Sequence, residues 1–139
     1  MVSDMRASLA FCLSALLLSA PASAQGSEGR LSVDLNRIDP LEGACRLTFM
    51  AENALGADLT ALSLETVLID TAGRVDRLTL FEFGVLPDGV PRVRQFDIPG
   101  LSCERLGRVL INGVAACSAG AACAEGLELT TRTDVEVIG

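Results

Sequence analysis

The side chains of this sequence that could do chemistry are cysteines and carboxylates. The chain contains no His, which excludes Ser-His-Asp and Cys-His nucleophile arrangements and imidazole metal ligands. It contains no Lys either, which excludes a Schiff base and a phosphate-loop lysine. Two carboxylates can together carry out acid–base chemistry, but the acidic residues from position 25 onwards are spread from Glu28 to Glu136 and no spacing marks out a pair. The composition therefore predicts a protein that is not an enzyme and needs no cofactor.

Four of the cysteines are predicted to form two disulfides. Cys117 and Cys123 flank five small residues in the stretch CSAGAAC, whereas Cys45 and Cys103 lie far apart. Zinc ligands typically come in pairs about two to four residues apart and redox centres use Cys-x-x-Cys, and the sequence has neither pattern. Four cysteines allow three pairings. We expect Cys117 to pair with Cys123, because the small spacer can fold back, and Cys45 to pair with Cys103 across two facing sheets.

The first 24 residues are typical of a cleavable secretory signal. Arg6 precedes an apolar run from residue 7 to about 20, and the small residues Ala-Ser-Ala end at Ala24, just before Gln25. A membrane anchor is the alternative, but the run is shorter than the roughly 20 residues that span a bilayer. We expect cleavage between Ala24 and Gln25, and loss of Cys12 with the signal.

The mature chain, residues 25–139, is long enough for one small domain. The net charge of −7 disfavours nucleic acid and anionic lipid surfaces as partners. No further stretch is long and apolar enough to span a membrane. The signal pattern therefore predicts a periplasmic or secreted protein without a membrane span in its mature part.

The mature sequence alternates between apolar and polar residues, with the period of two that is typical of half-buried strands. Turn signals at residues 70–73 and 86–91 separate these runs. We expect a small antiparallel, immunoglobulin-like β-sandwich of about seven strands, with a small β-barrel as the alternative. The expected strands cover residues 31–39, 46–52, 59–70, 74–83, 92–98, 108–116 and 127–137, and the last of these can be divided into two.

Residues 53–75, NALGADLTALSLETVLIDTAGRV, resemble the FxLYD-type immunoglobulin-like domains of bacterial exported proteins. Asn53 and Gly56 match the polar turn of that family, residues 68–70 stand where Leu-Tyr-Asp would be, and Gly73 matches the hairpin glycine. The sequence departs from the family where Thr66 replaces a Phe and where Ile replaces the Tyr. The resemblance supports a sandwich and implies neither an enzyme nor a particular ligand.

Two acidic groups lie close in sequence and carry ligand types that calcium prefers. No EF-hand loop or other compact ligand order is present, so we interpret both groups as a solvated acidic surface and expect no metal site. The residues concerned are Asp34, Asp39, Glu42, Asp134 and Glu136.

Two features are candidates for contact with a partner. Phe81 and Phe83 are expected in the core, and they would form a partner-binding patch if they faced outwards. Arg92 and Arg94 alternate with apolar and polar residues in an expected edge strand, where charges usually guard against aggregation. We expect an exported, non-catalytic module that binds a protein partner or supports an envelope assembly. The alternative is an extracytoplasmic enzyme that uses a carboxylate pair, or an enzyme inhibitor.

Overall fold

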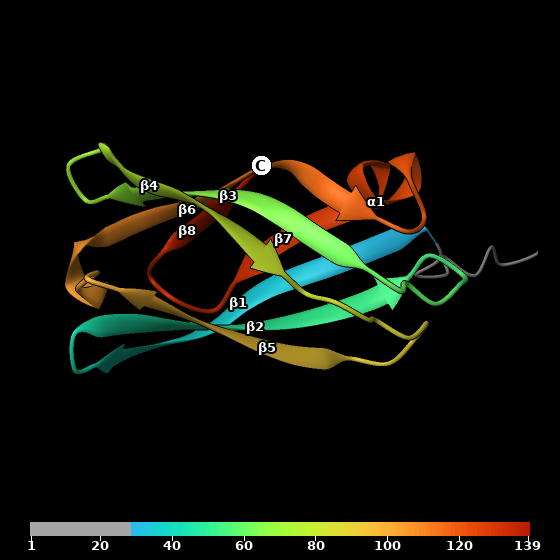
Figure 1. Cartoon of the computed structure of the whole chain (residues 1–139), viewed down its shortest axis with the longest axis horizontal. Coiled ribbons are helices and arrows are strands. Elements are labelled where there is room, and N and C mark those ends of the chain that lie inside the picture. Colours follow the sequence, from blue (N-terminus) through green and yellow to red (C-terminus); the bar gives the residue numbers. More distant parts are fainter. Residues whose placement is uncertain (1–28) are drawn as a thin grey trace, which may run out of the picture.

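Alternation of apolar and polar side chains gives a strand one apolar face and one polar face. The chain buries the apolar faces by packing two sheets face to face (Figure 1). The structure is a computed structural model that describes residues 29–139. The predicted signal, its cleavage site after Ala24 and Cys12 lie outside the described residues.

The first sheet has the strand order β5-β2-β1-β7. Its strands are β1 (Arg30–Leu41), β2 (Ala44–Ala54), β5 (Arg92–Pro99) and β7 (Leu127–Thr131). The second sheet has the order β4-β3-β6-β8. Its strands are β3 (Leu62–Asp70), β4 (Val75–Glu82), β6 (Leu106–Cys117) and β8 (Glu136–Ile138).

The predicted all-β sandwich is confirmed, and the barrel alternative is wrong because the strands form two separate sheets. Residues 29–139 form eight strands, since the last predicted run divides into β7 and β8. The expectation that every pairing is antiparallel is wrong at two places. β7 runs parallel to β1, with Leu31 opposite Leu127, and β8 runs parallel to β6, with Arg108 opposite Glu136. Alternation within a strand does not encode the direction of its neighbour, which is set by the long connections.

The strand β3 begins three residues later than predicted. Leu59 lies before the strand and pairs with Leu86 instead. The N–H of each residue donates to the carbonyl of the other, both at 2.9 Å. The predicted turn after β3 is present, because the Asp70 carboxylate accepts hydrogen bonds from the backbone N–H groups of Ala72 and Arg74.

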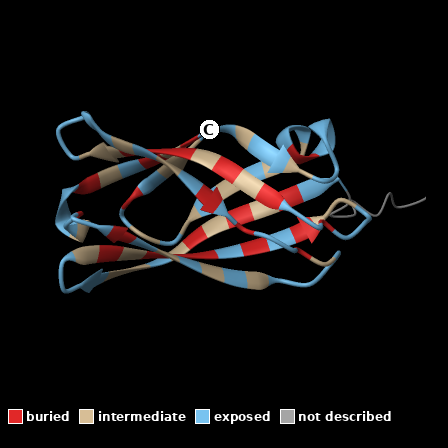
Figure 2. Cartoon of the chain, viewed as in Figure 1, coloured by how far each residue is buried: buried red, intermediate tan, exposed pale blue. Residues whose placement is uncertain are grey.

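The core lies between the sheets, where buried residues alternate with half-buried ones in β3 and with half-buried or exposed ones in β2 over much of each strand (Figure 2). Phe81 and Phe83 are both 1% exposed, so their predicted place in the core is confirmed. They form one aromatic cluster with Phe49 and Phe96, in which the rings of Phe81 and Phe96 stack with centroids 4.3 Å apart. This cluster fills the side of the sandwich between the edge strands β4 and β5.

Both predicted cysteine pairs lie at disulfide distance. Cys45 of β2 and Cys103 of the short 3₁₀ helix η1 (Cys103–Arg105) have Cα atoms 5.0 Å apart. This bridge ties β2 of the first sheet to the connection that enters β6 of the second sheet, as expected for a pair that joins the two sheets. Cys117 ends β6, and Cys123 lies in the short helix α1 (Ala121–Glu125), with Cα atoms 6.5 Å apart. The sequence patterns gave no sign of α1.

Candidate binding surface

A row of apolar side chains crosses the outer face of the second sheet. Val67 of β3 lies opposite both Leu78 of β4 and Leu110 of β6, and Leu110 lies opposite Ile138 of β8. Leu78 is 63% exposed, whereas its neighbour Val67 is only 7% exposed because the flanking strands cover it. We call these four residues the outer apolar row. Its most exposed end is at β4, the edge of the sheet.

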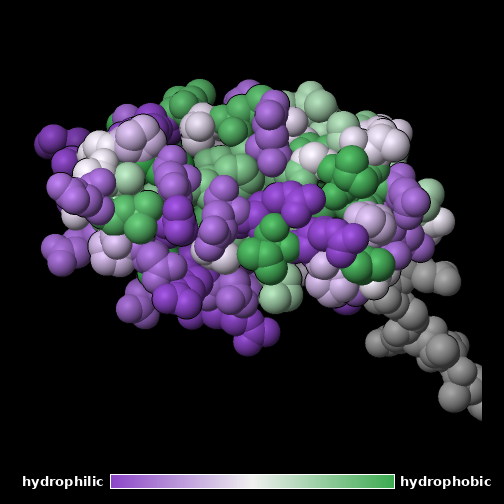
Figure 3. Space-filling view, turned by 60° about the horizontal axis from the view of Figure 1, so that its bottom comes forward, coloured by the Kyte–Doolittle hydropathy of each residue, from purple (hydrophilic) through white to green (hydrophobic). Residues whose placement is uncertain are grey.

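Exposed apolar residues are concentrated along the segment from β4 to β5. Of the eight large apolar side chains exposed among residues 29–139, six lie on β4, on β5 or in the loop between them. These six define the β4–β5 side: Val75, Leu78, Leu80, Val85, Val90 and Val93. Figure 3 shows hydrophobic patches between hydrophilic side chains on the face turned forward. Such clustering is typical of a surface that contacts another molecule.

Within residues 29–139, no strand pairs with the outer side of the β4 backbone. Just beyond the strand, the N–H of Phe83 donates to the carbonyl of Leu62. Because backbone groups alternate in direction along an antiparallel strand, the odd-numbered residues of β4 point their N–H and C=O groups towards β3. The backbone groups of Leu78, Leu80 and Glu82 therefore point away from the sheet. We call these groups the free edge of β4. The residues that carry the free edge also carry exposed side chains.

The edge strand β5 differs, because arginines bind two of its outward carbonyls, those of Val93 and Pro99, and the carbonyl of Pro91 just before it. Arg94 Nη1 donates to the carbonyl of Val93 at 3.0 Å, and Arg92 Nη1 donates to that of Pro91 at 3.2 Å. Arg77 Nη1 reaches the carbonyl of Pro99 at 2.6 Å, and proline has no N–H to offer a partner. The expected edge position of this strand is confirmed.

Arg94 also has a role that the sequence did not indicate. Its Nε donates to the carbonyl of Phe83 at 2.7 Å and its Nη2 to that of Val85 at 3.0 Å, so it ties the loop after β4 to β5. The expected guarding role of Arg92 and Arg94 stays a prediction, and both side chains lie on the half-buried side of β5. Exposed Val93 and Gln95 alternate with them on the outer side.

The predicted acidic residues lie in ion pairs or at the surface. Asp34 accepts a hydrogen bond from Thr130 and lies 3.6 Å from Arg132. Asp39 pairs with Arg37 at 2.8 Å, and Glu136 pairs with Arg108 at 2.7 Å. Glu42 and Asp134 are exposed. Within residues 29–139, no group of three or more Cys, Asp or Glu side chains is arranged to hold a metal ion.

One carboxylate has a displaced pKa. Asp97 of β5 lies opposite Arg46 of β2, whose Nε and Nη2 donate to the two carboxylate oxygens at 2.7 and 3.0 Å. These hydrogen bonds lower the pKa of Asp97, partial burial opposes them, and the charge of Arg46 adds to the lowering. A lowered pKa is the opposite of what a general acid needs at neutral pH.

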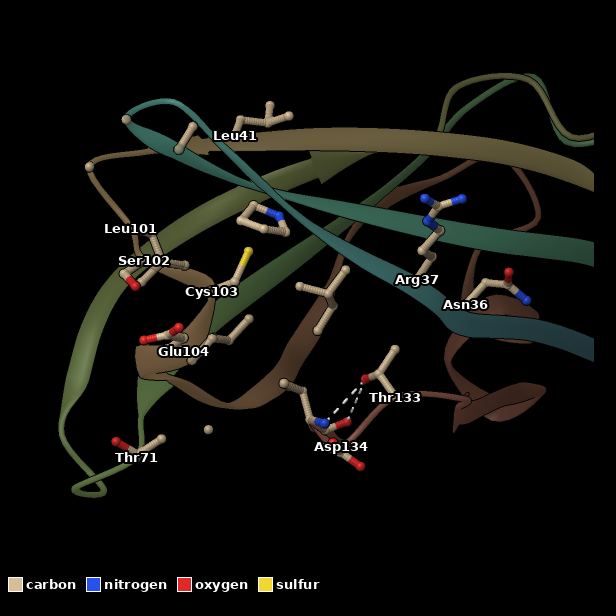
Figure 4. Close-up of a pocket in the computed structure, with 18 of the residues that line it drawn as sticks. Asn36, Arg37, Leu41, Thr71, Leu101, Ser102, Cys103, Glu104, Thr133 and Asp134 are labelled. Carbon is tan, nitrogen blue, oxygen red and sulfur yellow. Dashed lines mark hydrogen bonds between the residues drawn. The ribbon is translucent and has the colours of Figure 1, made fainter.

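An open hollow of about 1160 Å³ lies at the end of the sandwich near the Cys45–Cys103 bridge. Figure 4 shows it between Asn36 and Arg37 of β1, the segment 101–104, and Thr133 and Asp134. Its lining carries charges of both signs, and Arg37 is already paired with Asp39. Every buried polar side-chain atom in the described part of the chain has a hydrogen-bond partner. The hollow therefore does not indicate one class of ligand.

Comparison of the chain with protein-family models, with curated proteins and with solved structures found no match. None of the helices in residues 29–139 is long and apolar enough to cross a membrane. The stretch from Leu78 to Phe83 did contain a signal for the surface, because alternation places Leu78 and Leu80 on the face opposite to the buried Phe81 and Phe83.

Proposed function

We propose that this protein is an exported, non-catalytic module that binds a protein partner through its β4–β5 side. The observation that carries the proposal is the concentration of exposed apolar side chains at that side, beside an unpaired strand edge. The two disulfides are compatible with an oxidising space outside the cytoplasm, which the signal pattern of residues 1–24 also predicts.

The proposal is tested by capture of the tagged mature protein from envelope extracts, with partners identified by mass spectrometry. Leu78→Arg should lose the partner, because a charge replaces an apolar side chain that is 63% exposed on the edge strand β4. Leu41→Arg is the matched control, since Leu41 is 36% exposed but lines the hollow. Loss of the partner in Leu41→Arg alone would assign binding to the hollow instead.

The non-catalytic part of the proposal has its own test. A broad screen for hydrolase activity should give no turnover. Turnover that disappears on substitution of one carboxylate would replace the proposal with the alternative, an extracytoplasmic enzyme.

A further inference from the structure

We propose that the free edge of β4 accepts an extended segment of the partner as an added strand, and that this segment alternates apolar residues and carries a basic residue beside Glu82. The inference rests on the proposed binding function and specifies how the partner is recognised. Strand addition gains affinity from backbone hydrogen bonds and specificity from side chains at alternate positions.

The two edges on this side of the sandwich differ in their capacity to accept a strand. At β5, the carbonyls of Val93 and Pro99 already accept hydrogen bonds from Arg94 and Arg77. At β4, no hydrogen bond from a side chain within residues 29–139 reaches the backbone of the free edge. The strand also contains no Pro. Arginines and a proline thus obstruct part of the β5 edge, and β4 has neither safeguard along its outer side.

The side chains of the free edge define the chemistry of the added strand. Leu78 and Leu80 are 63% and 47% exposed, and an added strand would place two of its own side chains against them. Glu82 follows two residues later on the same face and is in none of the ion pairs of residues 29–139. Glu65 lies diagonally across from Glu82 and bonds only to the neutral amide of Asn112. A basic residue at this end of the added strand would complement both carboxylates.

A second copy of the chain is a poor occupant of the same edge. Two β4 strands paired antiparallel about a two-fold axis must face residues that lie on the same side of the sheet. If Leu80 of one copy faces Leu80 of the other, Glu82 is placed against Leu78 of the other copy. If Leu78 faces Leu80, Glu82 is placed against Asp76. Each arrangement sets an acidic side chain against an apolar or an acidic one, which is unfavourable.

The test uses a labelled peptide, Arg-Thr-Val-Thr-Val-Thr-Arg, blocked at both ends, and the mature protein. Binding should be saturable, and a peptide with Glu in place of both Arg should bind about tenfold more weakly. Hydrogen exchange measured by NMR gives a readout in the unsubstituted protein. The peptide should slow exchange at the amides of Leu78, Leu80 and Glu82, whereas the amides of residues 77, 79 and 81 already face β3.

Leu80→Pro removes an N–H that points away from β3, so it should spare the fold and weaken peptide binding by at least about tenfold. Gln95→Pro is the matched control on β5, where Gln95 also points its N–H outwards, and it should bind as the unsubstituted protein does. Circular dichroism checks that both variants fold.

Several results would overturn the inference. Equal binding of the two peptides, protection at other amides, or a stable dimer of the unsubstituted protein would each refute it. If the captured partner is lost in Leu78→Arg but kept in folded Leu80→Pro, the binding function stands and strand addition fails. If neither variant affects capture, the proposed function itself fails.

Discussion

Asn53 is a buried amide that holds two loops together. Its Nδ2 donates to the carbonyls of Ala57 at 2.7 Å and Leu86 at 2.9 Å, and its Oδ1 accepts from the N–H of Leu55 at 3.0 Å. The side chain is 0% exposed, so water cannot replace these partners. Asn53 of β2 therefore helps to position the loop that follows β4.

We expect Asn53→Ala to destabilise the protein by about 2–4 kcal/mol, because three hydrogen bonds are lost and two carbonyls are left without their partner. Chemical denaturation of both proteins measures the difference. Asn112→Ala is the control, since Asn112 is exposed and bonds only to Glu65, and it should cost less than about 1 kcal/mol. Equal costs for the two variants would contradict this account of Asn53.

The pair of Arg46 and Asp97 gives a pH-dependent prediction. The pKa of Asp97 is lowered in the folded protein, so the pair stabilises the protein above the ordinary aspartate pKa of about 3.9. This stabilisation is lost as the pH falls through the lower, folded pKa. Arg46→Gln should raise the pKa of Asp97 towards its ordinary value.

The titration is followed by NMR at the side-chain carboxyl carbon of Asp97. Arg46→Lys keeps the charge but not the two parallel hydrogen bonds, so it should raise the pKa by less than Arg46→Gln does. An unchanged pKa in Arg46→Gln would show that this pair does not form in solution.

At the scale of elements, Arg94 closes the side of the sandwich between two sheets. It bonds to the carbonyls of Phe83 and Val85 from β5, above the aromatic cluster. A lysine has a single ammonium nitrogen, so it cannot donate to both carbonyls from two separate nitrogens as the guanidinium does. We expect Arg94→Lys to cost about 1–2 kcal/mol in unfolding free energy. Arg92→Lys, which loses one bond to the adjacent Pro91 carbonyl, should cost about 0.5 kcal/mol or less.

Denaturant unfolding of the two lysine variants measures this comparison. Hydrogen exchange adds a local readout, because the loop 84–91 should open more often in Arg94→Lys and not in Arg92→Lys. If Arg92→Lys proves the more costly substitution, Arg94 does not close this side.

The two disulfides connect elements at different ranges of sequence. Cys45 and Cys103 are separated by 58 residues, and Cys117 and Cys123 by 6. On the loop-entropy account, replacing the first pair by alanines should cost about 4 kcal/mol and replacing the second about 2.4 kcal/mol. Thermal and denaturant unfolding of the two double variants measures the order. A larger cost for the short bridge would contradict the loop-entropy account here.

At the scale of the whole molecule, the acidic end of the β4 free edge should keep the protein from pairing with itself. When Leu80 of one copy faces Leu80 of the other, Glu82→Leu puts a leucine at position 82 opposite Leu78. We therefore expect this variant to self-associate through β4. Sedimentation velocity over a range of concentrations measures the effect.

Glu52→Leu is the control for self-association. It removes the same charge from an exposed residue of β2, which is an inner strand and has no free backbone edge. It should stay monomeric. Association of both variants to the same extent would show that surface hydropathy, and not the strand edge, is responsible.

Alternation along the sequence was enough to assign the buried face of several strands, although not of β5, where Arg92 and Arg94 lie on the half-buried side. Alternation assigned Phe81 and Phe83 to the core, and turn-forming residues placed the turn at residues 70–73. Both predictions succeed because they depend on neighbouring residues along the chain. The absence of His and Lys limited the available chemistry in the same direct way. The signal peptide, the family resemblance, the location and the partner remain predictions.

Only the tertiary structure decided which strands are edges and which neighbours they have. Leu31 and Leu127 pair in parallel although they lie almost a chain length apart, and no local pattern contains that pairing. The same alternation that buries Phe81 exposes Leu78, but its exposure follows from the position of β4 at the end of its sheet. From the sequence, Arg94 is a surface charge of an edge strand. Its bonds to the carbonyls of Phe83 and Val85 exist only because the fold brings β4 and β5 together. A strand edge is a relation between segments distant in sequence, so its free backbone groups become visible only when the sheet is assembled.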